Sequence, residues 1–503
     1  MFNALKFYNA CVENNIKPLI GVEMYLCDKM SNKNAEDRKL NHIVLIAKDY
    51  PGYINLIKLV SLANIDGFYY KPRLDLTTIA KYSKGILALS ACLQGEAQQL
   101  LLAGEYNKAL EAFSSYKDIF GEDFYIELMR NGLQEQMRIE PSMIKLSKEL
   151  DIKLIATTDS HYLNKEDSFS HEVALCIGTN QKILTMPKTK DNPKGRLVFG
   201  SEDFYVKSPQ EMNELYKDIP QALNATLEVA EKCNLEIPFR GVKLMKFNHP
   251  SGKAIDSFEY LKKLCRAGWK KRKINKDDKR YKNRIDYELD VIGKTRLSDY
   301  FLTVSDICSY ADANGIARNM GRGSAGASLV SYLLGITQVD PIEYGLIFER
   351  FYNIGRGIVR EINGDFYLDG SPADIDCDFE WAKRNKILEY IKSRWSNVCQ
   401  IITFNTMSAK AAIKYVARVL GIDLTIANNI TSFVPKGPDI TIKDALAKSE
   451  KLREYAKEYK KLFAIAEKLE GCIRNASIHA AGVLISDVAL DNLIPLAWDA
   501  KSK

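Results

Sequence analysis

The first 160 residues of the chain alternate between two hydrophobic patterns. Residues 1–16 place apolar side chains such as Leu5, Tyr8 and Val12 at helical spacing, and the apolar run at residues 17–26 predicts a buried strand. Further apolar strands are predicted at residues 42–47, 85–90, 124–128 and 153–156, with amphipathic helices between them. Strands that alternate with helices predict an α/β domain.

A glycine-rich stretch interrupts the pattern further along the chain. Residues 297–311 predict a helix, and they lead into Gly321, Gly323 and Gly326. Glycines this close together allow tight turns and a close backbone approach, and residues 329–334 after them are again helical in pattern. Backbone N–H groups at such a loop-to-helix junction favour an anion. A glycine-rich loop alone is weak evidence for an anion-binding site, so the interpretation depends on the residues that follow it in the sequence.

Three carboxylates stand at every second position after this loop, at Asp374, Asp376 and Asp378. On a strand, successive side chains point to opposite faces, so these three would share one face. Like charges that close are costly unless cations lie among them, and Mg²⁺ suits such oxygen ligands together with water and substrate phosphates. The pattern indicates phosphoryl or nucleotidyl transfer. The alternative is a solvated edge strand with an acidic face.

Composition and charge narrow the class of protein only slightly. The 503 residues are 46% hydrophobic and 27% charged, as in an ordinary globular protein of roughly two to four domains. No apolar run suits a membrane span and the N-terminus lacks a signal sequence, so we expect a cytoplasmic location and no membrane partner. The ten cysteines form no CxxC pair, and we expect reduced thiols. The net charge of +7 does not by itself indicate nucleic-acid binding, and the basic run at residues 276–284 is interpreted as a solvated helix face.

Side chains of the kinds that bind metals lie near several predicted strands of the first region. Glu23 ends one strand, Cys92 follows another, Asp159 and His161 follow a third, and His42 could join them. Sites in α/β folds assemble at the carboxyl ends of strands. Each residue taken singly is more often a packing or surface group.

Together these segments resemble a known family. The order of the segments 21–23, 42–47, 67–73, 88–92 and 158–162 is similar to the PHP metallo-phosphoesterase domain at the front of bacterial C-family replicative DNA polymerases, the DNA polymerase III α subunits. The glycine-rich loop, the connecting residues 335–351 and the three aspartates resemble the palm of the same polymerases. The resemblance covers nearly the whole chain and fits a host or a phage origin alike.

The resemblance implies a multidomain fold of the α/β and α+β classes. A PHP-type, barrel-like (β/α) domain is expected at the front, and a polymerase β-like nucleotidyltransferase palm with a helical thumb is expected after it. The expected boundaries are residues 1–240 for the PHP domain, 241–408 for the first part of the palm, 409–474 for the thumb and 475–503 for the second part of the palm.

The resemblance also assigns the residues of the palm. Asp376 and Asp378 fall on the catalytic acids that bind Mg²⁺, whereas Asp374 takes a structural or outer position. The residues that correspond to the triphosphate-binding loop are Arg322, Gly323 and Ser324. Ala373 departs from the family, which has proline there, and the long link before it carries Asn363-Gly364, which predicts a hairpin.

Basic residues after the palm point to DNA. Lys410, Lys414 and Arg418 are four apart and so share one helical face. The alternative to contact with DNA phosphates is a solvated face. The resemblance places Arg474 and His479 near the nucleotide, where the chain returns to the palm.

The function implied by the resemblance is DNA-directed DNA polymerisation in replication. The primer 3′-hydroxyl would attack the α-phosphorus of a dNTP by two-metal catalysis. The expected partners are primer-template DNA, dNTP and other replisome subunits, such as a sliding clamp or a second polypeptide that carries the fingers. The ligands expected for Zn²⁺ or Mn²⁺ in the PHP domain are Glu23, His42, Cys92, Asp159 and His161.

Two ends of the family pattern are absent from the chain. The first PHP ligands would precede Met1, and the third catalytic aspartate and the fingers would follow Lys503, so we expect a fragment truncated at both ends. One alternative is a PHP-type phosphoesterase or 3′–5′ exonuclease. The other is a catalytically inactive fragment that binds DNA.

Overall fold

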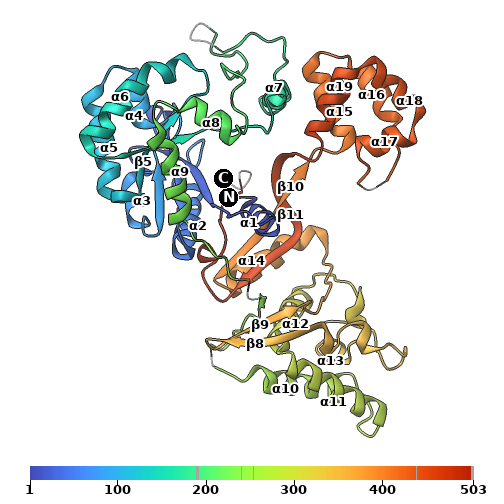
Figure 1. Ribbon diagram of the computed structural model, residues 1–503. Helices are drawn as coiled ribbons and strands as arrows, with labels where there is room; N and C mark the ends of the chain where they lie inside the picture. The colour runs from blue at the N-terminus through green and yellow to red at the C-terminus, as the bar shows by residue number, and fades with distance from the viewer. Residues whose placement is uncertain (189–191, 240, 253, 438, 500–503) are drawn as a thin grey trace. The chain divides into compact units, whose positions relative to one another are not determined.

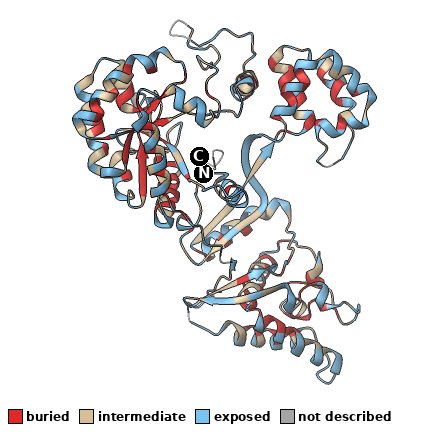
Figure 2. Cartoon of the chain, viewed as in Figure 1, coloured by how far each residue is buried: buried red, intermediate tan, exposed pale blue. Residues whose placement is uncertain are grey.

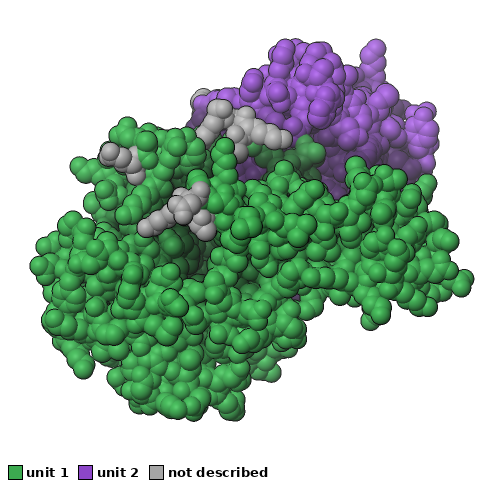
Figure 3. Space-filling view, turned by 90° about the horizontal axis from the view of Figure 1, so that it is seen from above, with its two compact units in different colours: residues 1–236, 401–481, 491–503 green, residues 237–400, 482–490 purple. Residues whose placement is uncertain are grey.

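The computed structural model describes residues 1–188, 192–239, 241–252, 254–437 and 439–499 (Figure 1). The chain divides into two compact units, each built from segments that are distant in the sequence (Figure 3). The first unit comprises residues 1–236, 401–481 and 491–503, and the second comprises residues 237–400 and 482–490. The predicted boundary at residue 240 and the last four residues of the predicted segment 475–503 lie outside the described residues.

The N-terminal part of the first unit is built on a six-stranded mixed sheet with the strand order β3-β1-β2-β4-β5-β6. Its strands are β1 (Gly21–Leu26), β2 (Asn41–Ala47), β3 (Arg73–Leu74), β4 (Ile86–Leu89), β5 (Phe124–Met129) and β6 (Lys153–Thr157). β1 and β2 are antiparallel, as are β2 and β4, whereas β4, β5 and β6 run parallel. The five predicted strands are confirmed, although β1 begins at Gly21 and the two-residue β3 was not predicted.

Helices alternate with these strands, which confirms the mixed α/β class. They are α1 (Ala4–Glu13), α2 (Tyr50–Ile65), α3 (Leu76–Lys81), α4 (Glu96–Leu102), α5 (Tyr106–Phe120), α6 (Gln134–Leu150), α7 (Ser168–Gly178), α8 (Pro209–Leu215) and α9 (Pro220–Lys232). Ala225 and Val229 of α9 pack against Leu87, Tyr125 and Ile155 of the sheet. The strands β4 and β5 are wholly buried, whereas β1 and β2 alternate between buried and partly exposed positions (Figure 2). In the described part of the chain, no helix has the length and apolar character needed to cross a membrane.

The second part of the first unit is a helical bundle. It contains α15 (Ala409–Leu420), α16 (Leu424–Ser432), α17 (Ile442–Lys448), α18 (Glu450–Glu458) and α19 (Lys460–Leu469). Their buried faces share one hydrophobic core, and Val173 and Cys176 of α7 pack into it beside Ile413 and Val416. The bundle follows β10 (Asn397–Thr406) and precedes β11 (Ile473–Ser486), which pair with each other in a two-stranded sheet.

The second unit combines helices with a small antiparallel sheet in the order β7-β9-β8. Its elements are β7 (Val242–Lys243), α10 (Ser257–Lys271), α11 (Lys279–Lys294), α12 (Ser298–Ala313), α13 (Leu329–Leu333), β8 (Gly357–Ile362), β9 (Asp365–Gly370) and α14 (Arg384–Arg394). Asn363 and Gly364 join β8 to β9 with φ angles of 52° and 81°, which confirms the predicted hairpin. The core packs Leu261, Val291 and Phe301 from the first three helices together.

Candidate metal and nucleotide site

In the second unit, the carboxylates of Asp376 and Asp378 both face the guanidinium group of Arg322. The Oδ1 atoms of Asp376 and Asp378 lie 3.5 and 3.4 Å from the same nitrogen of Arg322. Ile375 belongs to the hydrophobic core and Cys377 packs against it, so the acidic and the apolar side chains point to opposite sides. The two carboxylates therefore share a face, as their spacing predicts. Their role as metal ligands stays a prediction.

The prediction of a β-strand around these aspartates is wrong, because the segment does not form the hydrogen-bonded ladder of a strand. β9 ends at Gly370, and the only strand-like pairing after it, among the described residues up to 380, is an isolated bridge between Phe379 and Arg318. One hydrogen bond to a side chain and one bond within this bridge hold the segment. The N–H of Ile375 donates to the Tyr300 hydroxyl at 3.1 Å, and the N–H of Asn319 donates to the carbonyl of Asp378 at 3.0 Å.

Gly323 brings the glycine-rich loop directly against Asp376. Its φ angle is +71°, and a Cβ at this position would lie 2.5 Å from Oδ2 of Asp376, a distance at which atoms clash. The positive φ favours glycine, and any larger residue would also force the Asp376 carboxylate to move. Ser324 follows at once and begins a short 3₁₀ turn, Ser324–Ala327. The loop predicted to hold a triphosphate thus lies beside the acids predicted to bind metal.

Sequence reasoning missed a buried carboxylate that anchors the end of this loop. Glu288 on α11 is fully buried and accepts hydrogen bonds from the Ser328 hydroxyl at 2.9 Å and from the N–H groups of Leu329 and Val330 at 2.8 and 3.0 Å. Arg284 donates to Glu288 at 2.7 Å. Burial raises the pKa of Glu288, while the N–H donors and Arg284 oppose that shift. The interpretation of the basic run 276–284 as a solvated helix face is wrong for Arg284, whose side chain is largely buried against Glu288.

Three of the five predicted PHP ligands converge in the first unit. Nδ1 of His42 lies 2.8 Å from Oε1 of Glu23 and 3.7 Å from Sγ of Cys92. The ligand atoms of all three residues lie within 4.8 Å of one another. One carboxylate, one imidazole and one thiol fit a single transition-metal ion, and the thiol favours Zn²⁺ over Mn²⁺.

Asp159 and His161 follow β6 and lie outside this close group. His161 Nδ1 lies 2.7 Å from the carbonyl oxygen of Asp159 and 3.8 Å from its carboxylate. The His161 ring also packs against Phe199, with 4.7 Å between ring centroids. These contacts hold His161 in a fixed orientation.

The ionisation of the cluster reflects its partly buried position. The hydrogen bond from His42 lowers the pKa of Glu23, whereas burial raises the pKa of Asp159 and raises the pKa of Cys92 to about 12. A thiol with such a pKa ionises near neutral pH only if a cation compensates for its charge. Cys92 is therefore either a metal ligand or an inert, partly buried thiol.

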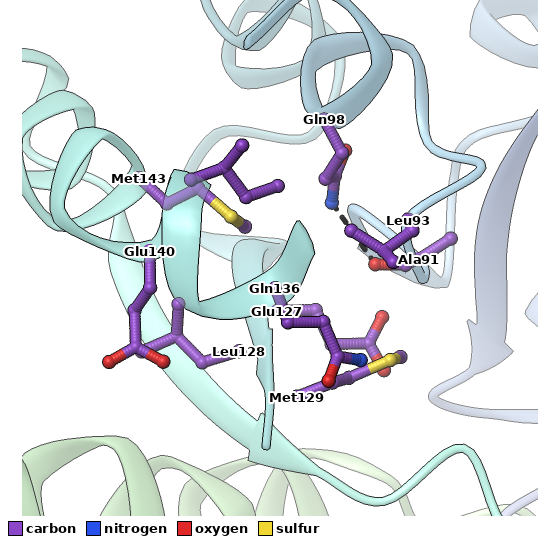
Figure 4. A pocket seen from close by; sticks show the side chains of 10 residues that line it. Ala91, Leu93, Gln98, Glu127, Leu128, Met129, Gln136, Glu140 and Met143 are labelled. Carbon is purple, nitrogen blue, oxygen red and sulfur yellow. Dashed lines mark hydrogen bonds between the residues drawn. The ribbon is translucent and has the colours of Figure 1, made fainter. Parts of the chain in front are cut away.

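Near this cluster, Glu127 on β5 is a second carboxylate that sequence reasoning missed. One carboxylate oxygen accepts the Thr157 hydroxyl at 2.6 Å, while the other has no protein partner among the described residues. It lines a cavity of about 20 Å³ together with Gln98 and Gln136 (Figure 4), which is room for one water molecule. Burial raises the pKa of Glu127 to about 7. The available signal was one acid inside the otherwise apolar strand Phe124–Met129.

This raised pKa predicts a pH-dependent stability. Because the folded-state pKa lies above the ordinary value of 4.5, the contribution of Glu127 is complete below that value and is lost as pH rises through about 7. The wild-type free energy of unfolding should fall by up to about 3 kcal/mol between pH 5 and pH 8, relative to Glu127→Gln. Urea unfolding of both proteins in EDTA at several pH values measures this. Parallel curves would contradict it.

The predicted basic face of α15 is only partly free. Lys410 and Lys414 are exposed and form no ion pair within the described residues, whereas Arg418 is half-buried and donates to the Asn180 side chain. Arg474 lies on β11 in the first unit, with its guanidinium 3.9 Å from the centre of the Tyr415 ring. His479 lies further along the same strand. A role of these residues at the nucleotide stays a prediction.

Comparisons with known proteins show which domains the chain contains. Residues 1–131 match the PHP domain, and residues 259–503 match the bacterial DNA polymerase III alpha NTPase domain. The chain is 39% identical over its whole length to the DNA polymerase III subunit alpha of Borreliella burgdorferi and 38% identical to that of Treponema pallidum. It spans 42% of the length of each of these two relatives.

The two domain matches define the class as a chain that joins a PHP domain to a bacterial DNA polymerase III alpha NTPase domain. The chain belongs to the family of DNA polymerase III alpha subunits, of which it spans a part.

Proposed function

We propose that this chain is the part of a DNA-directed DNA polymerase that holds metal ions and the incoming dNTP and contacts the primer-template duplex. The observation that carries the proposal is the contact of Gly323 with Asp376, which joins the phosphate-binding type of loop to the paired acids. The remaining length of the relatives would supply the fingers, as part of one polypeptide or as a second one. A sliding clamp is the expected replisome partner.

The paired acids fit Mg²⁺. Asp376 and Asp378 already share one cationic group, the Arg322 guanidinium, and both offer the hard carboxylate oxygens that Mg²⁺ prefers. When bound, two such ions would lower the pKa of the primer 3′-hydroxyl and stabilise charge on the leaving pyrophosphate.

The residues of this chain would position the reactants. Asp376 and Asp378 fix the place at which positive charge gathers, and the open backbone at Gly323 lets phosphate oxygens approach it. Arg322 is exposed, and its planar guanidinium suits phosphate. It can therefore release the two carboxylates and bind the triphosphate of the nucleotide instead. Glu288 holds the start of α13 behind the loop.

A test of this proposal uses Ser324. With the chain supplied with the downstream part of a relative, Ser324→Ala should raise the KM for dNTP roughly tenfold or more, because a hydrogen bond to a charged phosphate is lost. The affinity for primer-template DNA should stay the same. Ser393→Ala, at an exposed serine of α14, is the matched control. Equal losses in dNTP use and DNA binding would indicate a folding defect and contradict the assignment.

The exposed lysines of α15 lead to a salt-dependent prediction. If Lys410 and Lys414 contact phosphates, their double substitution by alanine should reduce the dependence of log Kd on log salt by roughly 1.8, because two neutralised phosphates are lost. Fluorescence anisotropy of a labelled duplex between low and physiological salt measures this. Lys108 and Lys145 are exposed but paired with Glu105 and Glu149, and their substitution should leave the slope unchanged. An unchanged slope in the first variant would remove the DNA-binding role of this helix.

A PHP-type phosphoesterase or 3′–5′ exonuclease is a second candidate function. The convergence of Glu23, His42 and Cys92 favours it, because the three could hold one Zn²⁺ or Mn²⁺ ion. Hydrolysis of a single-stranded oligonucleotide that is abolished by Glu23→Gln and retained by Asp376→Asn would support it. The opposite pattern would exclude it.

A further inference from the structure

Two cysteine thiols meet directly behind the paired acids of the second unit. Sγ of Cys308 on α12 lies 3.8 Å from Sγ of Cys377. Cys308 is 1% exposed and belongs to the hydrophobic core of this unit, and Cys377 packs against the same core while remaining partly exposed. Both are free thiols in the structure.

The position of Cys377 couples this pair to the candidate metal site. Cys377 stands between Asp376 and Asp378, so any displacement of its backbone also displaces both carboxylates. The segment lacks a β-ladder, whereas Cys308 lies in the middle of the helix Ser298–Ala313. Approach of the two sulfur atoms is therefore expected to move the acidic segment more than the helix.

We propose that Cys308 and Cys377 form a reversible disulfide that disables the metal site, an inference that rests on the proposed role of Asp376 and Asp378. The oxidant is a low-molecular-weight disulfide such as oxidised glutathione. It meets Cys377 first, because Cys308 is buried.

The chemistry is two successive thiol–disulfide exchanges. The Cys377 sulfur loses its proton, attacks one sulfur of oxidised glutathione and displaces one glutathione thiolate. Cys308 then loses its proton and attacks the sulfur of Cys377, which displaces the second glutathione. The two displaced thiolates take up the two protons. Two electrons pass from the protein thiols to the glutathione disulfide, which is reduced to two thiols.

The change in geometry is large compared with what a metal site tolerates. A disulfide bond is about 2.05 Å long, so the sulfur atoms must approach by about 1.8 Å from their separation of 3.8 Å. Metal–ligand distances are held within about 0.2 Å. If the acidic segment moves by only part of this 1.8 Å approach of the sulfur atoms, the two carboxylates are displaced by more than a metal site tolerates. Changes to residues behind metal ligands typically weaken metal binding about 10–100-fold.

The test measures the crosslink and metal binding separately in the full chain. The Cys92→Ala background removes one ligand and one thiol of the N-terminal cluster. Treatment with oxidised glutathione should yield, by mass spectrometry, a crosslink between the peptides of Cys308 and Cys377. Electron paramagnetic resonance should show Mn²⁺ binding at least tenfold weaker after oxidation and restored by dithiothreitol. Cys377→Val, which keeps an apolar side chain of similar size, should bind Mn²⁺ regardless of oxidant.

The control is Cys265→Ser, which removes another buried thiol of the same core and should leave the oxidative loss unchanged. Absence of the Cys308–Cys377 crosslink, or a crosslinked chain with unchanged Mn²⁺ affinity, would overturn the inference. If the reduced chain does not bind Mn²⁺, the proposed function is overturned. The proposed loss of metal binding on oxidation then falls with it, whether or not the crosslink forms.

Discussion

Replacement of both Asp376 and Asp378 by asparagine is expected to weaken Mn²⁺ binding to the second unit more than about 100-fold. Each substitution removes a charged oxygen that would contact the metal directly, and changes merely behind metal ligands already cost about 10–100-fold. Both carboxylates lie within 3.5 Å of one Arg322 nitrogen, so they define a single site rather than two independent ones. Electron paramagnetic resonance titration measures this affinity in the Cys92→Ala background, in which the N-terminal cluster has lost one of its ligands.

The matched control is Asp374→Asn. Asp374 carries the same chemistry two residues earlier but is exposed and forms no ion pair with Arg322 in the described structure. Its substitution should change the Mn²⁺ affinity less than about threefold, as expected for distant charge screened by solvent. If Asp374→Asn and the double variant lose equal affinity, the acidic stretch acts only as a diffuse negative patch.

Replacement of Glu288 by alanine is expected to destabilise the second unit by about 3–5 kcal/mol. The substitution leaves the Arg284 guanidinium without its buried counter-charge and removes the acceptor of the Ser328 hydroxyl and of two N–H groups at the start of α13. The Ser328 hydroxyl and the two N–H groups then lose their acceptor in the core, whereas Arg284 keeps only its hydrogen bonds to the carbonyls of Ala327 and Leu346. Urea unfolding followed by tryptophan fluorescence measures the loss.

The chain offers a matched control on the same helix. Asp290 pairs with Lys294 at the same four-residue spacing, but both side chains are more than half exposed. Asp290→Ala should cost less than about 0.5 kcal/mol, because exposed pairs of this kind contribute little. Similar losses in the two variants would show that Glu288 is not a structural anchor.

The fold was largely predictable because it depends on local patterns. The strands of the N-terminal sheet are short, mainly apolar runs, and their ends were placed within a few residues, because single polar positions such as Glu23 and Glu127 do not interrupt the apolar pattern. The hairpin at Asn363 and Gly364 was predictable because its turn needs two residues with positive φ. β3 was missed because two residues carry no periodic signal.

The site was predictable only in its residue types. Alternation at Asp374, Asp376 and Asp378 correctly indicates a shared face, but a β-ladder also needs a partner strand, which no local pattern supplies. An arginine and a glutamate four residues apart look alike on exposed and buried helices, so Arg284 and Glu288 could not be distinguished from a solvated pair. Tertiary packing alone decides between them.

The basic face of α15 shows the same limit of local spacing. Lys410, Lys414 and Arg418 share a face by periodicity, yet Arg418 is bonded to Asn180, which is far away in the sequence. Arg474 likewise stacks on Tyr415, a contact that no spacing along the chain predicts. Among these basic residues, the predicted contact with DNA phosphates therefore rests on Lys410 and Lys414.

Primer extension tests the central claim most directly. The chain is combined with a polypeptide carrying the remaining downstream length of the Borreliella burgdorferi relative, and extension of a labelled primer in Mg²⁺ and dNTP is followed. We expect primer extension by the wild-type pair of polypeptides and by the pair that carries Asp374→Asn. The double variant Asp376→Asn with Asp378→Asn should extend the primer at least about 1,000-fold more slowly. The chain alone should show no comparable extension. Extension by the double variant at the wild-type rate would contradict the assignment of these two acids as the catalytic metal ligands.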